Sequence, residues 1–229
     1  MPAGKAPGGR AGTVPPPADR RRRARTVLSR LKKAYPDATC ALTHCDAYQL
    51  LVATILSAQC TDTRVNMVTP ALFQKYPTAD ALAHARQSDL EDIIRSTGFF
   101  RNKATNLIGM AQAVVADHEG RVPDSMEALQ ALPGVGRKTA NVVLGNAFGK
   151  NHGVVVDTHV GRISRLLELT DQKDPVKVER DLMLLFPRKD WTLLAHLLIS
   201  HGRQVCIARR PQCTDCVLAN RCPSAQLPV

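Results

Sequence analysis

The chain has 229 residues, with 31 Lys and Arg against 20 Asp and Glu, which gives a formal net charge of +11. This length allows one large domain or two small ones, and no apolar run is long enough for a membrane protein. The basic excess points to a polyanionic partner, nucleic acid before a membrane surface. No apolar signal segment precedes the fold, which predicts a cytoplasmic location.

The first 25 residues are basic and poor in apolar side chains. They contain seven Lys or Arg residues, a single acidic residue, Asp19, and the proline run Pro15–Pro17. Such a composition cannot bury enough apolar surface to fold, so residues 1–25 are predicted to form a disordered basic arm. The arm is either a solvated tail or an additional, salt-sensitive contact to DNA.

From residue 26 onward the sequence has helical periodicity. An apolar stripe begins at Val27 and ends at Tyr35, Asp46 is placed to cap the next helix, and Asp124 and Glu127 form a predicted capping box for helix 125–131. Few segments alternate with the period of a strand. The chain is therefore predicted to be all-α, with short loops. Further helical segments are expected near residues 63–75, 78–84, 88–96, 101–118, 137–147, 158–169, 175–186 and 190–201.

Residues 132–140, Leu-Pro-Gly-Val-Gly-Arg-Lys-Thr-Ala, end one helix and start another at Arg137 or Lys138. Gly134 and Gly136 bring bare backbone N–H groups to the N-terminus of the second helix, where an anion can bind. This pattern predicts a helix–hairpin–helix, which grips a DNA phosphate through its backbone without reading sequence. The alternative is an ordinary glycine-containing turn between two helices.

Lys138 is the candidate nucleophile. A helix N-terminus beside Arg137 disfavours a further positive charge, which would free the amine to attack an electrophilic sugar carbon. Such a step needs a carboxylate nearby, and Asp157 is the best-placed candidate because it follows Val154–Val156, a run too short for a strand and interpreted as a buried connector. The alternative roles are a phosphate clamp for Lys138 and a helix N-cap for Asp157.

Four of the seven cysteines form the pattern C-x6-C-x2-C-x5-C near the C-terminus: Cys206, Cys213, Cys216 and Cys222. Disulfides would need an oxidising compartment. The spacing leaves a structural zinc site and a [4Fe–4S] cluster equally open, although the single flanking cysteines suit a loop that wraps around something larger than one ion.

Two further motifs accompany the hairpin lysine: Leu-Ser-Ala-Gln-Cys-Thr-Asp at 56–62 and Val-Asp-Thr-His-Val at 156–160. His-Gly-Arg at 201–203 then leads into the cysteines. With these motifs in this order over residues 26–223, the chain closely resembles the endonuclease III family of base-excision repair glycosylases, within the helix–hairpin–helix superfamily.

The resemblance implies two all-α domains with a DNA-binding groove between them. One is a six-helix barrel at 41–150 that contains the helix–hairpin–helix, and the other is a discontinuous helical domain formed by 26–40 and 151–229. It also implies that the four cysteines hold a [4Fe–4S] cluster.

The activity implied by the resemblance is that of a bifunctional DNA glycosylase and AP lyase that excises oxidised pyrimidines from double-stranded DNA. Lys138 would attack C1′ of a flipped nucleotide and form a Schiff base, Asp157 would assist, and β-elimination would nick the strand. A monomer that also acts at abasic sites, associated with the nucleoid, is expected. The alternatives are a monofunctional glycosylase of the same superfamily and a non-catalytic helix–hairpin–helix DNA-binding protein.

Two departures from the family pattern stand out. Phe99 occupies the place of an aliphatic wedge against the opposite strand, and the linker between Lys138 and Asp157 is about one residue longer, which we interpret as a loop insertion at 150–152. Gln59 matches the residue that fills the hole left in the duplex. The full set of expected DNA contacts is Gln59, Phe99, Gly134, Val135, Gly136, Arg137, Thr139, His159, Arg209 and Arg210.

Overall fold

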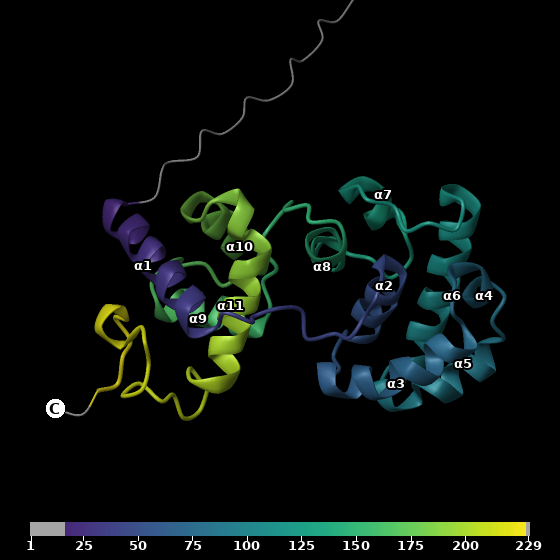
Figure 1. Cartoon of the computed structure of the whole chain (residues 1–229), viewed down its shortest axis with the longest axis horizontal. Helices are drawn as coiled ribbons and strands as arrows, with labels where there is room; N and C mark the ends of the chain where they lie inside the picture. The colour runs from purple at the N-terminus through teal and green to yellow at the C-terminus, as the bar shows by residue number, and fades with distance from the viewer. Residues whose placement is uncertain (1–16, 228–229) are drawn as a thin grey trace, which may run out of the picture.

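The computed structural model describes residues 17–227 of the chain. Between these residues there are eleven α-helices, three 3₁₀ helices and no β-strand, which confirms the predicted all-α fold (Figure 1). No helix in this range is long and apolar enough to span a membrane. The α-helices are α1 (Ala18–Ala34), α2 (Ala47–Leu56), α3 (Asp62–Lys75), α4 (Ala79–Ala83), α5 (Gln87–Ile94), α6 (Phe100–His118), α7 (Met126–Ala131), α8 (Arg137–Ala147), α9 (Thr158–Leu166), α10 (Pro175–Leu185) and α11 (Trp191–Gln204), and the 3₁₀ helices are η1 (Arg95–Thr97), η2 (Arg188–Asp190) and η3 (Ala219–Arg221).

Two local predictions are confirmed. Asp46 caps α2, where its Oδ1 accepts a hydrogen bond from the Gln49 N–H at 2.8 Å. The segment Val154–Val156 has no regular secondary structure and enters the fold through the buried side chain of Val154. Both features follow from short-range chemistry that the sequence alone contains.

The predicted capping box before α7 is wrong. The N-cap is Ser125, whose Oγ accepts from the Ala128 N–H at 3.2 Å. The Asp124 carboxylate instead forms an ion pair with Lys150. The Asp124 side chain therefore pairs with a lysine that is distant in sequence and does not take the capping role that the local pattern predicts.

Two separate hydrophobic cores divide the helices. Buried apolar residues between Leu42 and Leu144, from α2 to α8, form the first core, while α1, α9, α10 and α11 form the second. In Figure 1, α1, α9, α10 and α11 make one lobe and α2 to α7 make the other, with α8 between them. We propose that the cores correspond to the predicted domains, with the second domain beginning at α1 and not at residue 26.

The prediction that residues 1–25 form a disordered arm is wrong for residues 18–25. These residues are the first half of α1, and Ala24 is fully buried in the second core. Ala and Arg are among the best helix formers, and the small side chain of Ala24 allows close packing. Residues 1–16 lie outside the described part of the chain.

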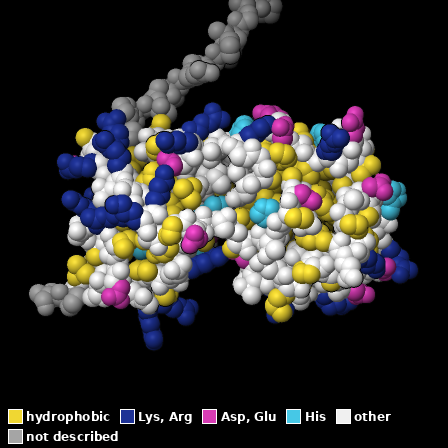
Figure 2. Space-filling view, in the orientation of Figure 1, with side chains coloured by type: hydrophobic (Ala, Val, Ile, Leu, Met, Phe, Trp, Pro, Cys, Tyr) yellow, Lys and Arg dark blue, Asp and Glu magenta, His cyan; other side chains and the backbone are white. Residues whose placement is uncertain are grey.

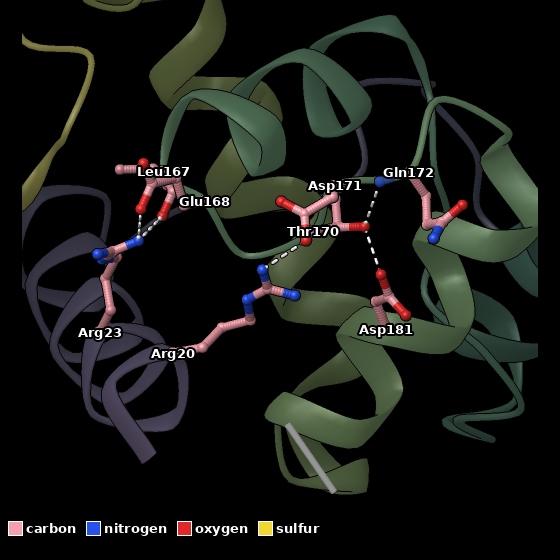
Figure 3. Close-up of polar contacts among 8 residues, drawn as sticks. All are labelled: Arg20, Arg23, Leu167, Glu168, Thr170, Asp171, Gln172 and Asp181. Carbon is pink, nitrogen blue, oxygen red and sulfur yellow. Dashed lines mark hydrogen bonds and ion pairs between the residues drawn. The ribbon is translucent and has the colours of Figure 1, made fainter. Parts of the chain in front are cut away.

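Two arginines of the predicted arm contact the α9–α10 connection (Figure 3). Arg20 donates to the Asp171 carboxylate at 2.7 Å. Arg23 donates to the Leu167 carbonyl at 3.0 Å and to the Glu168 carboxylate at 2.8 Å. Lys and Arg side chains also gather over the lobe that contains α1 (Figure 2). Part of the positive charge that was expected to contact DNA therefore forms contacts within the protein.

The packing of α1 leads to a stability prediction. Ala24→Glu should lower the free energy of unfolding by about 2–4 kcal/mol, because it places a carboxylate without a partner in an apolar core. Urea unfolding followed by circular dichroism measures this. Ala18→Glu is the matched control, since Ala18 is exposed in the first turn of the same helix, and it should change stability by less than about 0.5 kcal/mol. Equal stability of the two variants would contradict the burial of α1.

Candidate active site and nucleic-acid interface

The chain between α7 and α8 makes a tight hairpin. Gly134 has a φ of 75°, and an added Cβ would lie 2.9 Å from the Asn106 Cβ, so the position requires glycine. The Val135 side chain is buried, and its N–H donates to the Leu132 carbonyl at 3.1 Å. Gly136, the N-cap of α8, has no side chain to accept from the first-turn N–H groups, so these donors can meet an anion. This is the predicted helix–hairpin–helix.

Lys138 and Asp157 line the same cavity, which has a volume of about 190 Å³ and receives residues from both cores. Lys138 is exposed and is the second residue of α8. Asp157 is half-buried and caps α9, with its Oδ1 accepting from the Val160 N–H at 2.8 Å. The structure thus brings the two predicted catalytic side chains to one cavity, and Asp157 also has the alternative role of N-cap.

Polar contacts join the walls of this cavity. Arg203 on α11 donates to Asp62 at the start of α3 at 2.6 Å, and His196 on α11 contacts the Asn146 Oδ1 on α8 at 2.7 Å. Burial lowers the pKa of His196, so its ring is neutral at physiological pH and donates Nε2–H to the amide oxygen. The cavity is therefore bounded by hydrogen bonds that link one core to the other.

A buried carboxylate holds the start of α8. Glu179 on α10 accepts from Arg137 Nη2 at 2.8 Å and Nε at 3.0 Å, and also from Asn141 Nδ2 at 3.1 Å. Gly153 makes room for it, because an added Cβ would collide with Glu179 Oε1. The expectation that the Arg137 charge acts on Lys138 needs correction, since Glu179 compensates that charge. A DNA contact by Arg137 stays a prediction.

Gln59 and Phe99 both have left-handed backbones, with φ of 53° and 47°. Each is exposed, and the Phe99 side chain is 64% exposed although it is large and apolar. Left-handed φ in residues other than glycine is uncommon and is often found at functional sites. Both side chains lie on surface loops, outside the lining of the Lys138 cavity, where a duplex could reach them.

The remaining predicted DNA contacts differ in accessibility. Thr139 is half-buried, whereas Arg209 and Arg210 are exposed on the loop between the first two cysteines of the C-terminal group. The ring of His159 packs against Gly202, where an added Cβ would lie 2.7 Å from Nδ1. Its orientation is therefore set by α11, and its contact with DNA stays a prediction.

The four C-terminal cysteines line one cavity of about 240 Å³. A single water needs only about 10–15 Å³, so there is room for a group of many atoms. Burial raises the pKa of the Cys222 thiol, and the three other cysteines add to the rise. Among residues 17–227, no group of three or more His, Cys, Asp or Glu side chains is arranged around a single metal ion. The donors and the space suit a group larger than one ion.

Side chains from the second core contact these sulfurs. Arg162 lies 3.5 Å from Cys206 Sγ and donates to the Cys206 carbonyl at 2.6 Å. His201 Nε2 lies 3.5 Å from Cys216 Sγ, and its Nδ1 is 2.9 Å from the Tyr35 hydroxyl. Burial, with a smaller contribution from Arg162, lowers the pKa of His201 to about 4. The neutral ring can therefore donate to sulfur and accept from tyrosine.

Both the sequence and the fold match known proteins. The family model for HhH-GPD superfamily base excision DNA repair protein matches residues 52–188. Endonuclease III of Synechocystis sp. is 57% identical over 209 residues, which cover 91% of this chain and 95% of that protein. The chain belongs to the endonuclease III family.

Two solved structures of endonuclease III share the fold. One is a non-covalent endonuclease III–DNA complex, and the other is a trapped endonuclease III–DNA covalent intermediate, an estranged-adenine complex. Each matches with a TM-score of 0.85 and 41% sequence identity, over 90% of this chain and 96% of the other. The family and the two-lobed helical fold predicted from the sequence are thus confirmed.

The cap role of Asp157 predicts a difference between two substitutions. Asp157→Ala should lower the free energy of unfolding by about 1 kcal/mol because α9 loses its N-cap, whereas Asp157→Asn should change it by only a few tenths, since Asn caps equally well. Asp174→Ala removes the corresponding cap of α10 and should match the first loss. Chemical denaturation of the three variants measures this, and an Asp157→Asn variant as unstable as Asp157→Ala would show that the cap is not what stabilises α9.

Proposed function

We propose that this protein is a bifunctional DNA glycosylase and AP lyase that removes damaged bases, with oxidised pyrimidines as substrates, and then nicks the strand. The observation that carries the proposal is that Lys138, at a helix–hairpin–helix, and Asp157 line one cavity. A covalent intermediate has been trapped between endonuclease III and DNA, which supports a covalent route in this family.

The chemistry follows from an amine and a carboxylate in one cavity. Lys138 Nζ attacks C1′ of the damaged nucleotide, the glycosidic C1′–N bond breaks, and the base leaves with the bonding electrons and takes up a proton. Asp157 accepts the proton released by the amine and balances the positive charge that develops on the sugar. Opening of the C1′–O4′ bond gives the imine as O4′ takes up the proton from the nitrogen and becomes a hydroxyl, and loss of a C2′ proton then expels the 3′ phosphate by β-elimination.

The hairpin and the surface loops hold the duplex. The first-turn N–H groups of α8 receive a backbone phosphate and fix the DNA without reading its sequence. Arg209 and Arg210 add phosphate contacts on the cysteine loop. The groove is the boundary between the two cores, where hydrogen bonds join walls that carry both polar and apolar side chains.

Reaching C1′ requires the damaged nucleotide to leave the helix. Flipping costs a few kcal/mol and costs least at a damaged base, which contributes to selection. Gln59 fills the space that the nucleotide leaves, and Phe99 inserts against the opposite strand, where an aromatic ring stacks on bases. A single chain contains all these parts, so we propose that the monomer is the active form on double-stranded DNA.

We further propose that Cys206, Cys213, Cys216 and Cys222 hold a [4Fe–4S] cluster. Four thiolate donors around one cavity of about 240 Å³ fit such a group better than a single ion. When bound, the cluster would fix the chain that carries Arg209 and Arg210. The other residues near the sulfurs, Arg162 and His201, would orient two of the ligands.

The nucleophile is tested by reductive trapping. Borohydride added to the protein with a duplex that contains thymine glycol or an abasic site should give a covalent adduct, because it reduces the imine on Lys138. Lys138→Ala should give none, while Lys150→Ala, a nearby exposed lysine beyond the end of α8, should give the wild-type yield. Gel electrophoresis under denaturing conditions separates the adduct.

The same assay examines Asp157. Asp157→Asn keeps the N-cap but removes the carboxylate charge, so the single-turnover rate of base removal should fall by about 100-fold or more while stability is retained. A trapped adduct with Lys138→Ala, or no adduct with wild-type protein that binds the duplex, would overturn the proposed function.

The cluster is tested by metal content. Purified protein should be yellow-brown and contain about four irons per chain. Cys213→Ser should lose iron, whereas Cys45→Ser, at an exposed cysteine outside the group, should keep it. Colourless protein with one zinc per chain would overturn the cluster and leave the proposed glycosylase chemistry standing.

A further inference from the structure

Lys103 is a buried lysine outside the Lys138 cavity. It lies near the start of α6, is 5% exposed, and its Nζ donates to the Leu56 carbonyl and the Thr97 carbonyl, each at 2.8 Å. Burial lowers the pKa of Lys103, and the neighbouring thiol of Cys60 opposes the shift. An amine enclosed in this way and bonded to two carbonyls is not a second nucleophile, so another role must explain the cost of burying it.

The two carbonyls stand at the ends of two helices. Leu56 is the last residue of α2, and Thr97 is the last residue of η1. Carbonyls at helix C-termini lack intrahelical donors and carry partial negative charge, which makes an ammonium group a suitable partner. The backbone N–H of Lys103 also donates to the Phe99 carbonyl at 3.1 Å. One residue therefore holds two segments that are distant in sequence.

Each held carbonyl is followed within three residues by an exposed residue with a left-handed backbone. Gln59 comes three residues after Leu56, and Phe99 comes two residues after Thr97, beyond Gly98, whose φ is 71°. Backbones of this kind persist only where surrounding contacts hold them. The buried ammonium group is a contact common to both loops.

We propose that Lys103 is a positioning residue that holds Gln59 and Phe99 at a fixed separation, so that the two side chains enter a duplex as one unit. The inference rests on the proposed function, which is what sends these side chains into DNA. An opening duplex pushes on both loops, and neither loop can move back without breaking a buried ammonium–carbonyl hydrogen bond. Specificity for a base-paired lesion would then depend on a residue that does not touch DNA.

The test removes the donors and keeps the length of the side chain. Lys103→Met is compared with Lys103→Arg, which keeps the charge and can donate to both carbonyls, and with Lys75→Met, an exposed lysine on α3. Two duplexes are used: one with thymine glycol paired with adenine, and one with an abasic site facing a one-nucleotide gap. The second needs no base pair to be opened, but it keeps the duplex flanks that the hairpin grips.

Lys103→Met should slow single-turnover base removal at the paired lesion by about 10–100-fold, since a misplacement of about 1 Å can cost about 100-fold. Borohydride trapping at the gapped abasic site should stay within about twofold of wild type, as should affinity for undamaged duplex, which phosphate contacts dominate. Lys103→Arg should recover most of the lost rate. Lys75→Met should behave as wild type on both duplexes.

A fluorescence measurement reports insertion without chemistry. In the Lys138→Ala background, 2-aminopurine beside the thymine glycol should brighten on binding as it unstacks, and the added Lys103→Met substitution should abolish that rise at saturating protein. Circular dichroism and thermal melting show whether each variant is folded before it is compared.

Equal losses on the two duplexes, or no loss on the paired lesion, would overturn the positioning role. A Lys103→Arg variant as slow as Lys103→Met would also overturn it. Failure of the proposed function looks different, because wild-type protein would then neither remove thymine glycol nor form an adduct at the gapped abasic site.

Discussion

The geometry of the site depends on one buried carboxylate. Glu179 belongs to the second core, yet its oxygens accept from Arg137 and Asn141, both on α8, which packs in the first core. A buried charge that loses its partner costs several kcal/mol, so α8 has one favourable position against α10. That position fixes the N-terminus of α8, whose first-turn N–H groups have no side-chain cap, and places Lys138, which follows Arg137, in the cavity with Asp157.

The boundary between the cores is held by directional contacts of this kind. Asp62 pairs with Arg203, and Asn146 bonds to His196, so the walls of the cavity are joined by hydrogen bonds whose geometry is set to a few tenths of an ångström. Apolar side chains such as Val155 and Ile199 also line the cavity, so the hydrogen bonds fix the position of its walls without filling it.

Local chemistry in the sequence was enough to predict most of the helices and the hairpin, whereas the pairing of Lys138 with Asp157 was a hypothesis that rested on the family resemblance. What the sequence could not provide is the long-range partner of a charge. Glu179 lies 42 residues from Arg137, and Lys103 lies 47 residues from the Leu56 carbonyl, with no local pattern to join them. The start of α1 was missed for a similar reason, because the acceptors of Arg20 and Arg23 lie in the other half of the chain.

The packing of α1 has a consequence for the order in which the molecule assembles. All buried residues of the first core lie in one continuous stretch between Leu42 and Leu144, so that core can form as soon as the stretch has left the ribosome. The partners of α1 come far later: Arg23 contacts a carbonyl 144 residues away, and Tyr35 contacts His201, 166 residues away. The first helix of residues 17–227 is therefore among the last to dock, and the second core closes only when almost the whole protein exists.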